Sequence, residues 1–347
     1  MSELGAVTGR HAFDIVRLQA HLERHLPEFR GPLEVQQFQG GQSNPTYLLT
    51  TPAAKYVMRS KPGPSAKLLP SAHAIEREFH VMRALAAQGI PVPWTLLLVE
   101  DESVIGRAFY VMQHVEGRIF WEQSLPGVSN AERSAIYDEM NRVIARLHMV
   151  DMERAGLSDY GKSGNYFERQ IGRWSKQYRA SETETVEAMN RLIDWLPAHI
   201  PPGDETTVVH GDYRLDNLIF HPNEPRIIAI LDWELSTLGH PLADFSYHCM
   251  SWHIAPGAFR GIAGLDHAAL GIPAEAEYIR RYTERTGRAP IDHWNFYLAY
   301  NLFRIAAILQ GVYKRSTEGL ASSNNAAQAG RNARALAELG WTYAGRA

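Results

Sequence analysis

The sequence predicts an α+β protein in which a small β-rich part is followed by a larger, mainly helical part. Two observations lead to this class. Short runs of aliphatic, aromatic and threonine residues alternate with turn residues between positions 33 and 112, which is typical of strands. After Gly117 the apolar residues mostly recur at helical spacing. We therefore expect two domains, residues 1–113 and residues 114–347, with a hinge near residues 113–118.

In the first domain, helical apolar spacing over residues 12–26 predicts a helix, and five strands follow it. A second helix interrupts the strands after the third one. It is expected to begin after Ser71, a suitable N-cap, and to reach Gln88 before a glycine ends it. The predicted strands are Leu33–Phe38, Thr46–Thr51, Lys55–Ser60, Trp94–Val99 and Arg107–Met112.

The second domain is predicted to be helical, with a small β-rich island between its third and fourth helices. The island contains three short apolar runs, Thr206–Val209, Leu218–Phe220 and Arg226–Leu231. The predicted helices are Asn130–Val150, Tyr166–Tyr178, Thr185–His199, Pro241–His253, Glu275–Thr286, Trp294–Arg315 and Ala326–Trp341.

The composition is that of a folded globular protein and excludes several classes. Of the 347 residues, 45% are hydrophobic and 21% are charged, and the net charge is −3. Because there is no basic excess or stripe, we expect no nucleic-acid partner. No apolar run is as long as a membrane span, and the first residues do not resemble a secretory signal, so we expect no membrane partner. The single cysteine, Cys249, excludes an internal disulfide and favours a cytoplasmic protein. These features leave the oligomeric state open.

The island carries the residues with the clearest chemistry. His210, Asp212 and Asn217 follow its first strand, and Asp232 follows its last. Antiparallel strands joined by a short turn bring Asn217 and Asp232 to one end of the hairpin, where their oxygens suit Mg²⁺. A carboxylate at Asp212 could orient a substrate hydroxyl and accept its proton. This set is the one that phosphoryl transfer requires.

Each of these residues has an alternative interpretation. Three fixed positions can occur by chance, and Asp and Asn in loops commonly cap turns. The apolar strands on both sides of the motif favour the catalytic interpretation. His210 is expected to brace the loop by hydrogen bonds and not to carry a proton.

The loop and the metal aspartate resemble a known family. The strings HGDYRLDN, residues 210–217, and ILDWE, residues 230–234, are similar to the signature of the aminoglycoside phosphotransferase family, a branch of the protein-kinase-like fold. The resemblance extends over nearly the whole chain. It implies a bilobal kinase-like fold, ATP or GTP with Mg²⁺, and transfer of the γ-phosphoryl group to a hydroxyl of a small molecule.

The same resemblance assigns further residues to nucleotide binding. A glycine-containing loop, the third strand, the helix after it and the hinge each match a family motif. Glycines without a Cβ would let the backbone approach phosphates, although a plain β-turn is the alternative for them. The expected cofactor-binding residues are Gly40, Gly41, Ser43, Asn44, Arg59, Lys61, Glu78, Gln113 and Val115.

Arg59 departs from the family pattern, which generally places Lys on the third strand. Lys61 is the other candidate, because it lies two residues further along the same face of the strand. Arg can bind phosphate through two nitrogens but is not equivalent to Lys. Glu78 is the expected ionic partner of Arg59, and an exposed salt bridge of little weight is the alternative.

Longer stretches resemble one subgroup, the kinase-like domain fused to acyl-CoA dehydrogenases in animals. They are YVMRSKPGPSAKLLPSAHAIEREF, YFERQIGRWSKQY and FRIAAILQGVYKR, which begin at residues 56, 166 and 303. This resemblance implies an acceptor of the hydroxyacyl type, such as a hydroxyacyl-CoA, and not an antibiotic. It does not imply dehydrogenase activity. A nucleotide-binding pseudokinase without catalysis is the alternative that the Arg59 departure leaves open.

A rival motif lies in the string GLSDYGKS, residues 156–163, which matches the P-loop pattern. A P-loop must follow a buried strand and open a helix. The residues before this string are charged and read as the end of a helix. Asp159 would also place a negative charge in the phosphate cradle. A P-loop NTPase is therefore the least favoured interpretation.

Overall fold

The computed structural model describes residues 4–39, 44–62, 74–257, 259–318 and 326–347. The chain forms two compact units that are interleaved along the sequence. Unit 1 comprises Met1–Ile119, Asp151–Tyr160 and Asn217–Ser236, and unit 2 comprises Phe120–Val150, Gly161–Asp216 and Thr237–Ala347. A single cut after residue 113 therefore does not separate the two units, because the chain returns to unit 1 after leaving it.

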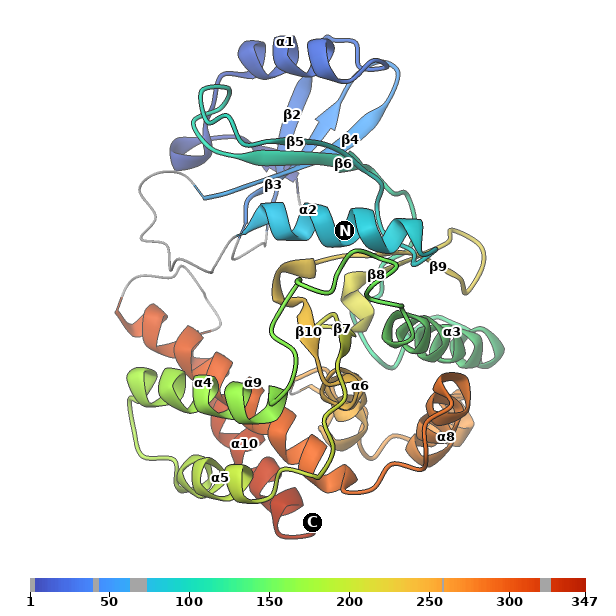
Figure 1. Cartoon of the computed structure of the whole chain (residues 1–347), viewed down its shortest axis with the longest axis vertical. Helices are drawn as coiled ribbons and strands as arrows, with labels where there is room; N and C mark the ends of the chain where they lie inside the picture. The colour runs from blue at the N-terminus through green and yellow to red at the C-terminus, as the bar shows by residue number, and fades with distance from the viewer. Residues whose placement is uncertain (1–3, 40–43, 63–73, 258, 319–325) are drawn as a thin grey trace. The chain divides into compact units, whose positions relative to one another are not determined.

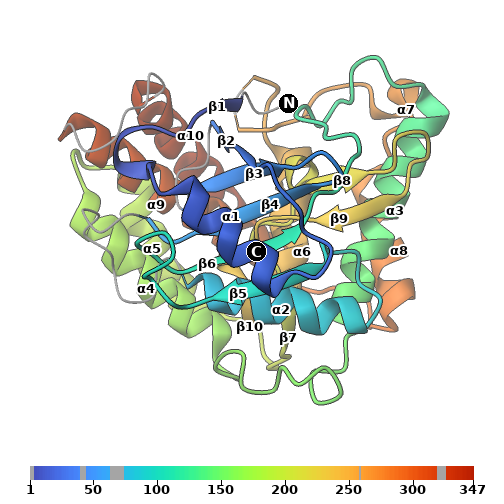
Figure 2. The same ribbon diagram turned by 90° about the horizontal axis from the view of Figure 1, so that it is seen from above.

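Unit 1 is built on an antiparallel sheet of six strands in the order β1-β2-β3-β4-β6-β5. Helices α1 (Ile15–His25) and α2 (Ile75–Ala87) lie on opposite faces of this sheet (Figures 1 and 2). The five predicted strands are confirmed, and the structure adds the three-residue β1. The strands are β1 (Leu4–Ala6), β2 (Glu34–Phe38), β3 (Thr46–Thr50), β4 (Lys55–Ser60), β5 (Thr95–Val99) and β6 (Phe109–Gln113).

The ends of the two helices differ from the prediction. Helix α1 begins at Ile15 and not at residue 12, because the Asp14 carboxylate accepts a hydrogen bond from the Arg17 amide at 3.0 Å and caps the helix. Helix α2 begins at Ile75, and the predicted cap Ser71 lies outside the described residues.

The core of unit 1 lies between α1 and the sheet. Leu18 and Leu22 of α1 are fully buried against Tyr47, Met58 and Phe109 from three different strands. On the other face, α2 buries not only apolar side chains but also the carboxylate of Glu78, which is 2% exposed. A buried carboxylate requires a partner, and the sheet supplies it.

A hairpin of β8 (Leu218–Phe220) and β9 (Ile227–Ile230) also belongs to unit 1. Arg118 and Phe220 exchange two backbone hydrogen bonds of 2.8 Å. A Cβ on the preceding Gly117 would lie 2.3 Å from the Phe220 carbonyl oxygen. Only glycine allows the chain to leave the sheet this close to the hairpin.

Unit 2 is mainly helical, with one two-stranded ladder of β7 (Thr207–Val209) and β10 (Thr237–Gly239). The predicted helices are confirmed; the short β10 and α7 were not predicted, and the helix expected at Pro241–His253 gives way to a 3-10 turn after Cys249. No helix of the described chain is long and apolar enough to cross a membrane. The helices are α3 (Asn130–His148), α4 (Tyr166–Ser181), α5 (Glu187–Ala198), α6 (Pro241–Cys249), α7 (His267–Leu270), α8 (Glu275–Thr286), α9 (Trp294–Thr317) and α10 (Ala326–Ala344).

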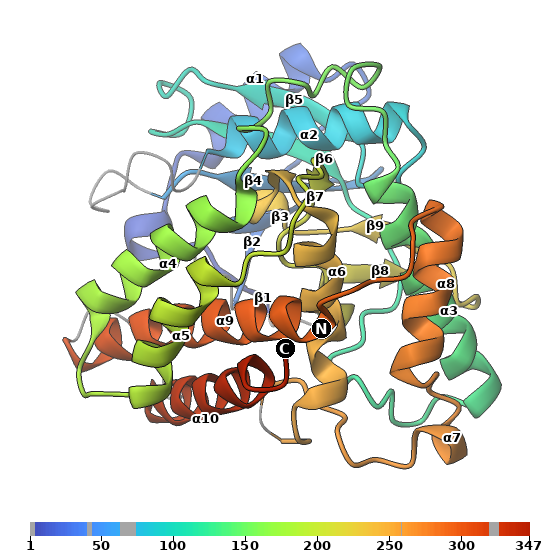
Figure 3. The ribbon, with the colours of Figure 1, turned by 60° about the horizontal axis from the view of Figure 1, so that its bottom comes forward.

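Helix α9 is the centre of one group of helices in unit 2. It contacts α4, α5, α6 and α10, and Figure 3 shows α4, α5 and α10 around it. Its buried residues include Arg304.

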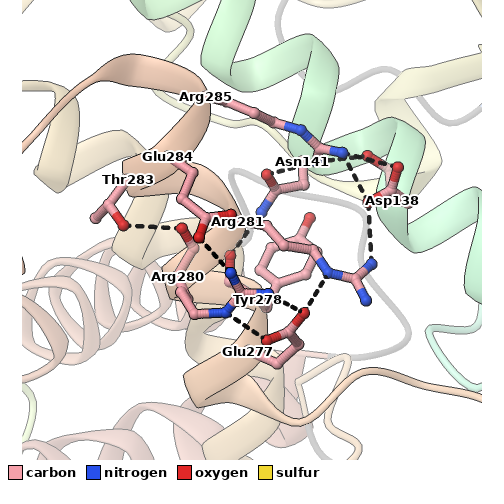
Figure 4. Close-up of polar contacts among 9 residues, drawn as sticks. All are labelled: Asp138, Asn141, Glu277, Tyr278, Arg280, Arg281, Thr283, Glu284 and Arg285. Carbon is pink, nitrogen blue, oxygen red and sulfur yellow. Dashed lines mark hydrogen bonds and ion pairs between the residues drawn. The ribbon is translucent and has the colours of Figure 1, made fainter.

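Helices α3 and α8 form a second pair, joined by a polar network (Figure 4). Arg285 donates to both oxygens of Asp138 at 2.8 Å, and Arg281 adds a third contact at 3.0 Å. Burial opposes ionisation of Asp138, but the hydrogen bonds from Arg285 and Arg281 hold its pKa below the ordinary value. Asn141 accepts from Arg285 and donates to the Tyr278 carbonyl, which ties the two helices together.

The buried His248 predicts a pH dependence of stability. Burial lowers the pKa of His248 to about 4, and its Nε2 lies 2.7 Å from the Tyr278 hydroxyl. The unfolded chain would take up this proton near pH 6.5, so the free energy of unfolding should fall as the pH drops from about 6.5 to about 4. The full effect is on the order of 3 kcal/mol for one histidine.

The test is urea unfolding between pH 7 and pH 4. His248→Gln should lose less stability on acidification than the wild type, because glutamine can keep the contact with Tyr278 but has no proton to gain. His199→Gln, at an exposed side chain of the same unit, is the matched control. If the free energy of unfolding fell equally with pH in the wild type and in His248→Gln, the proposed role of His248 in the pH dependence would be contradicted.

Candidate active site

In unit 1, Arg59 of β4 lies at the centre of a buried ionic cluster. Its Nε is 3.1 Å from Glu78 of α2. Its Nη2 is 3.0 Å from Asp232 and 3.0 Å from Glu234, which follow β9. The side chains of Arg59 and Glu78 are 13% and 3% exposed. The predicted pairing of Arg59 with Glu78 is thus present, and it is not the exposed, weak bridge that was the alternative.

The cluster sets one positive charge against three carboxylates. Although burial opposes it, the carboxylates of Glu78 and Asp232 raise the pKa of Arg59, so the guanidinium stays charged. Burial raises the pKa of Glu78 to about 7, against the opposing effect of Arg59. Tyr110 donates to Glu78 at 3.2 Å. The excess of negative charge suits a site for a bound cation.

Two other predicted nucleotide-binding residues surround the cluster. Asn44 is 2% exposed, and its side-chain amide donates a hydrogen bond to Glu78 at 2.9 Å. This donor is therefore already used by a group of the protein. Lys61 pairs with Glu76 on α2 and makes no contact with Glu78 among the described residues. Of the two candidate basic residues, Arg59 is therefore the one that contacts both Glu78 and Asp232. Gly40, Gly41 and Ser43 lie outside the described residues.

The predicted hinge residues lie where the sheet ends. Gln113 is the last residue of β6, and its amide donates to the Trp94 carbonyl at 2.8 Å. The Gln113 amide is therefore already used in the sheet. Val115 is half-buried in the segment that follows β6.

The predicted metal ligands lie at one end of the β8–β9 ladder. Leu218 pairs with Ile230, and the Leu231 amide donates to the Asn217 carbonyl at 2.8 Å. This register places Asn217 and Asp232 at the same end of the hairpin. Asp232 has φ +65°, a left-handed conformation that a non-glycine residue adopts only under constraint.

The donor set fits a hard cation. Asp232 and Asn217 offer carboxylate and amide oxygens, which Mg²⁺ prefers. In the described residues no group of three or more His, Cys, Asp and Glu side chains could hold a metal ion on its own. A metal at this end of the hairpin would therefore also need oxygens from a substrate or water.

In unit 2, the loop after β7 is held from beneath by Asp244 of α6. Its two oxygens accept from the amides of His210 at 2.7 Å and Gly211 at 2.8 Å. His148 lies 3.2 Å from the same carboxylate. Burial opposes ionisation of Asp244, but the hydrogen bond from His148 lowers its pKa. The ring of His210 is fully buried, and its Nδ1 accepts from the Asp212 amide at 3.1 Å.

The carboxylate of Asp212 is held at both oxygens. The Tyr247 hydroxyl donates to Oδ1, and Arg214 Nε lies 3.2 Å from Oδ2. Burial raises the pKa of Tyr247, and the nearby charge of Asp212 raises it further. The phenol therefore keeps its proton and remains the donor. Arg304 of α9 donates to the Gly211 carbonyl at 2.6 Å and lies over the Tyr247 ring at 5.2 Å.

Sequence reasoning did not identify Tyr247 and Arg214 as partners of Asp212. Tyr247 and Arg304 reach the loop from α6 and α9, so no local spacing could indicate them. The only signal was for Arg214, a basic residue two positions after Asp212.

A small cavity in unit 2 borders the two groups that hold Asp212. Tyr247 and Arg214 line it, together with Arg260 and the apolar side chains of Met250, Ile254 and Phe259. Arg260 donates to Asp216 at 2.8 Å. Both arginines of the lining are thus paired with carboxylates, since Arg214 Nε also lies 3.4 Å from Asp216. The cavity has a volume of about 20 Å³, which is room for a group of about the size of one water molecule.

The string that matches the P-loop pattern has the wrong context. Residues 149–165 are all described, and they form turns and bends after α3 and before α4 begins at Tyr166. The string lacks the strand–loop–helix arrangement that a P-loop requires, which agrees with the expectation that it is not a P-loop.

Known proteins resemble the chain over most of its length. Residues 34–294 match the model of the phosphotransferase enzyme family, APH. The chain is 52% identical over 317 residues to mouse acyl-CoA dehydrogenase family member 10 and 45% identical over 342 residues to rat family member 11. These matches cover 90% and 96% of the chain but only 29% and 44% of the relatives, so the chain spans less than half of either protein.

Solved structures agree with this assignment. A crystal structure from Ralstonia eutropha JMP134, provisionally described as an aminoglycoside phosphotransferase, is 62% identical with a TM-score of 0.88, and covers 96% of this chain and 99% of that one. Spectinomycin phosphotransferase APH(9)-Ia is 14% identical with a TM-score of 0.62, over 95% and 98% of the two chains, and so shows the fold alone. The chain therefore belongs to the phosphotransferase enzyme family and has the kinase-like fold of the aminoglycoside phosphotransferases.

Proposed function

We propose that the chain transfers the γ-phosphoryl group of ATP or GTP to the hydroxyl group of a small molecule, with Mg²⁺. The observation that carries this proposal is the presence of two arrangements. One is the Arg59–Glu78 pair joined to Asp232, and the other is Asp212 held at both carboxylate oxygens. A nucleotide is supported by the relative APH(9)-Ia, which was solved with ADP and spectinomycin.

Each residue has a separate task in the proposed reaction. Asn217 and Asp232 would hold Mg²⁺, which neutralises phosphate charge when it is bound. Arg59, fixed by Glu78, would keep Asp232 in place and present positive charge to the phosphates. Asp212 would accept a hydrogen bond from the acceptor hydroxyl and take its proton as the new O–P bond forms. The bond between the γ-phosphorus and the β–γ bridging oxygen would break in the same transfer, and ADP or GDP would leave.

We further propose that the reacting hydroxyl of the acceptor reaches Asp212 from the side of Tyr247 and Arg214, where a cavity of about 20 Å³ has room for such a group and not for a whole acceptor. The acceptor class we propose is a hydroxyacyl compound, such as a hydroxyacyl-CoA, because the apolar side chains of Met250, Ile254 and Phe259 border the same place. The similarity to part of the acyl-CoA dehydrogenase family members supports the same acceptor class.

Nucleotide binding is tested by thermal denaturation with ATP or GTP, each with and without Mg²⁺. A ligand that binds the folded state raises the melting temperature. We expect a Mg²⁺-dependent rise in the wild type and its loss in Asp232→Ala. Asp194→Ala, at an exposed carboxylate of α5, is the control and should keep the rise. No rise with any nucleotide in the wild type would contradict the proposal.

Catalysis is tested separately by Asp212→Asn. Transfer to hydroxyacyl-CoAs, or to water as the acceptor, should fall by roughly 10²- to 10⁴-fold, because a general base is lost. Binding of Mg²⁺–nucleotide should remain. If nucleotide binds but the wild type and Asp212→Asn are equally inactive, the chain is a binding module without catalysis.

Tyr247 should act as a positioning residue for Asp212. Tyr247→Phe removes one hydrogen bond to the carboxylate and should lower kcat by roughly 10- to 100-fold, with the KM for nucleotide unchanged. The pH dependence of kcat should also change, because the environment of the carboxylate changes. Tyr213→Phe is the matched control, since the buried Tyr213 hydroxyl donates to the Met140 carbonyl and not to Asp212. Equal losses in both variants would indicate a purely structural effect.

A further inference from the structure

We propose that unit 1 carries a second ligand site, which binds a small anion bearing phosphate or carboxylate groups. The site is a hollow of about 450 Å³ between one face of α2 and the loop at residues 156–160. This volume is within the range of small-molecule sites. No residue assigned to phosphoryl transfer lines it.

Basic side chains form the α2 wall of this hollow. Arg77, His80 and Arg83 lie at positions i, i+3 and i+6, so they share one face of the helix. Within the described part of the chain, Arg83 has no hydrogen bond or ion pair, and His80 has only a ring contact with Phe79. These two side chains are therefore available to a ligand.

Arg77 is held in place by the opposite wall. Its guanidinium lies 4.3 Å from the centre of the Tyr160 ring and donates to the Tyr160 carbonyl at 2.8 Å. An arginine that is already ordered pays less entropy when it binds an anion. Asp159 is the one acidic residue of the lining, so positive charge exceeds negative. Its carboxylate could accept from a hydroxyl or amine of the ligand.

Both walls of the hollow are connected to the Arg59 cluster. The α2 wall carries Glu78, the partner of Arg59, on another face of the same helix. On the loop wall, the Tyr160 hydroxyl is 2.6 Å from Ser236, whose amide donates to the Trp233 carbonyl beside Asp232 and Glu234. A ligand that contacts both walls would therefore bias the geometry of the cluster. We infer that the anion site is coupled to Arg59.

The test is a titration of the full chain with inorganic pyrophosphate in EDTA, observed through the side-chain Nε–Hε resonances of ¹⁵N-labelled arginine. Resonances are assigned with Arg77→Lys, Arg83→Lys and Arg59→Lys. We expect the Arg77 and Arg83 signals to shift with one saturable midpoint, and the Arg59 signal to follow with the same midpoint. Arg83→Gln should weaken binding roughly tenfold or more.

Arg24→Gln, at an exposed arginine of α1, is the matched control and should leave the midpoint unchanged. Three outcomes would overturn the inference. Non-saturating shifts that include Arg24 would show a general ionic effect. An Arg59 midpoint that Arg83→Gln does not move would place the anion in the proposed nucleotide site. Saturable shifts of Arg77 and Arg83 with no response at Arg59 would remove the coupling. None of these readouts requires enzymatic activity, so they are independent of the proposed phosphotransferase function.

Discussion

A buried guanidinium determines how unit 1 assembles its part of the site. Burying a charge is costly unless partners compensate it, and Arg59 finds its partners on α2 and on the segment after β9. One side chain thus links the sheet, the helix and the segment after the hairpin. An arginine suits this position better than a lysine would. The planar fork presents Nε to Glu78 and Nη2 to Asp232 and Glu234, whereas a lysine would offer one nitrogen for all three.

In unit 2, a buried carboxylate plays the corresponding part. Asp244 accepts hydrogen bonds from two backbone amides of the loop and faces His148, so it fixes the backbone before Asp212. Hydrogen bonds to an ionised group are stronger than neutral ones, and this group is shielded from water. The loop therefore has little freedom to depart from one conformation. Tyr247 and Arg214 then act on a carboxylate whose backbone is already fixed.

Most elements of the fold and part of the candidate site could be predicted, because they depend on residues that are close together in the sequence. Strand and helix positions follow from the spacing of apolar residues, and the pairing of Arg59 with Glu78 follows from the family motifs. The prediction failed where the local signal is weak. Strand β1 was missed because it has only three residues, two of them glycine and alanine. The start of α1 was misplaced because it depends on one capping residue.

The remaining features of the candidate site depend on contacts between residues that are far apart in the sequence. Tyr247 lies on α6, and nothing in its neighbourhood in the sequence indicates that its hydroxyl meets Asp212. Arg304 looked like one arginine of a helix, yet it is buried against the Gly211 carbonyl. Glu234 could have faced solvent, and only the path of β4 brings Arg59 to it. Periodicity identifies the face of an element, but it does not identify which partner that face meets.

The division of the chain has a mechanistic consequence. The motif from His210 to Asn217 is continuous in sequence, but the boundary between the two units falls between Asp216 and Asn217. Asp212 is held by Tyr247 and Arg214 of unit 2, whereas Asn217 is fixed by the Leu231 amide of unit 1. Each half of the proposed chemistry is therefore ordered by its own unit. One short loop supplies residues to both functions. Even so, a mutation should be able to impair binding of the metal and nucleotide without impairing activation of the acceptor hydroxyl, and the reverse should also hold.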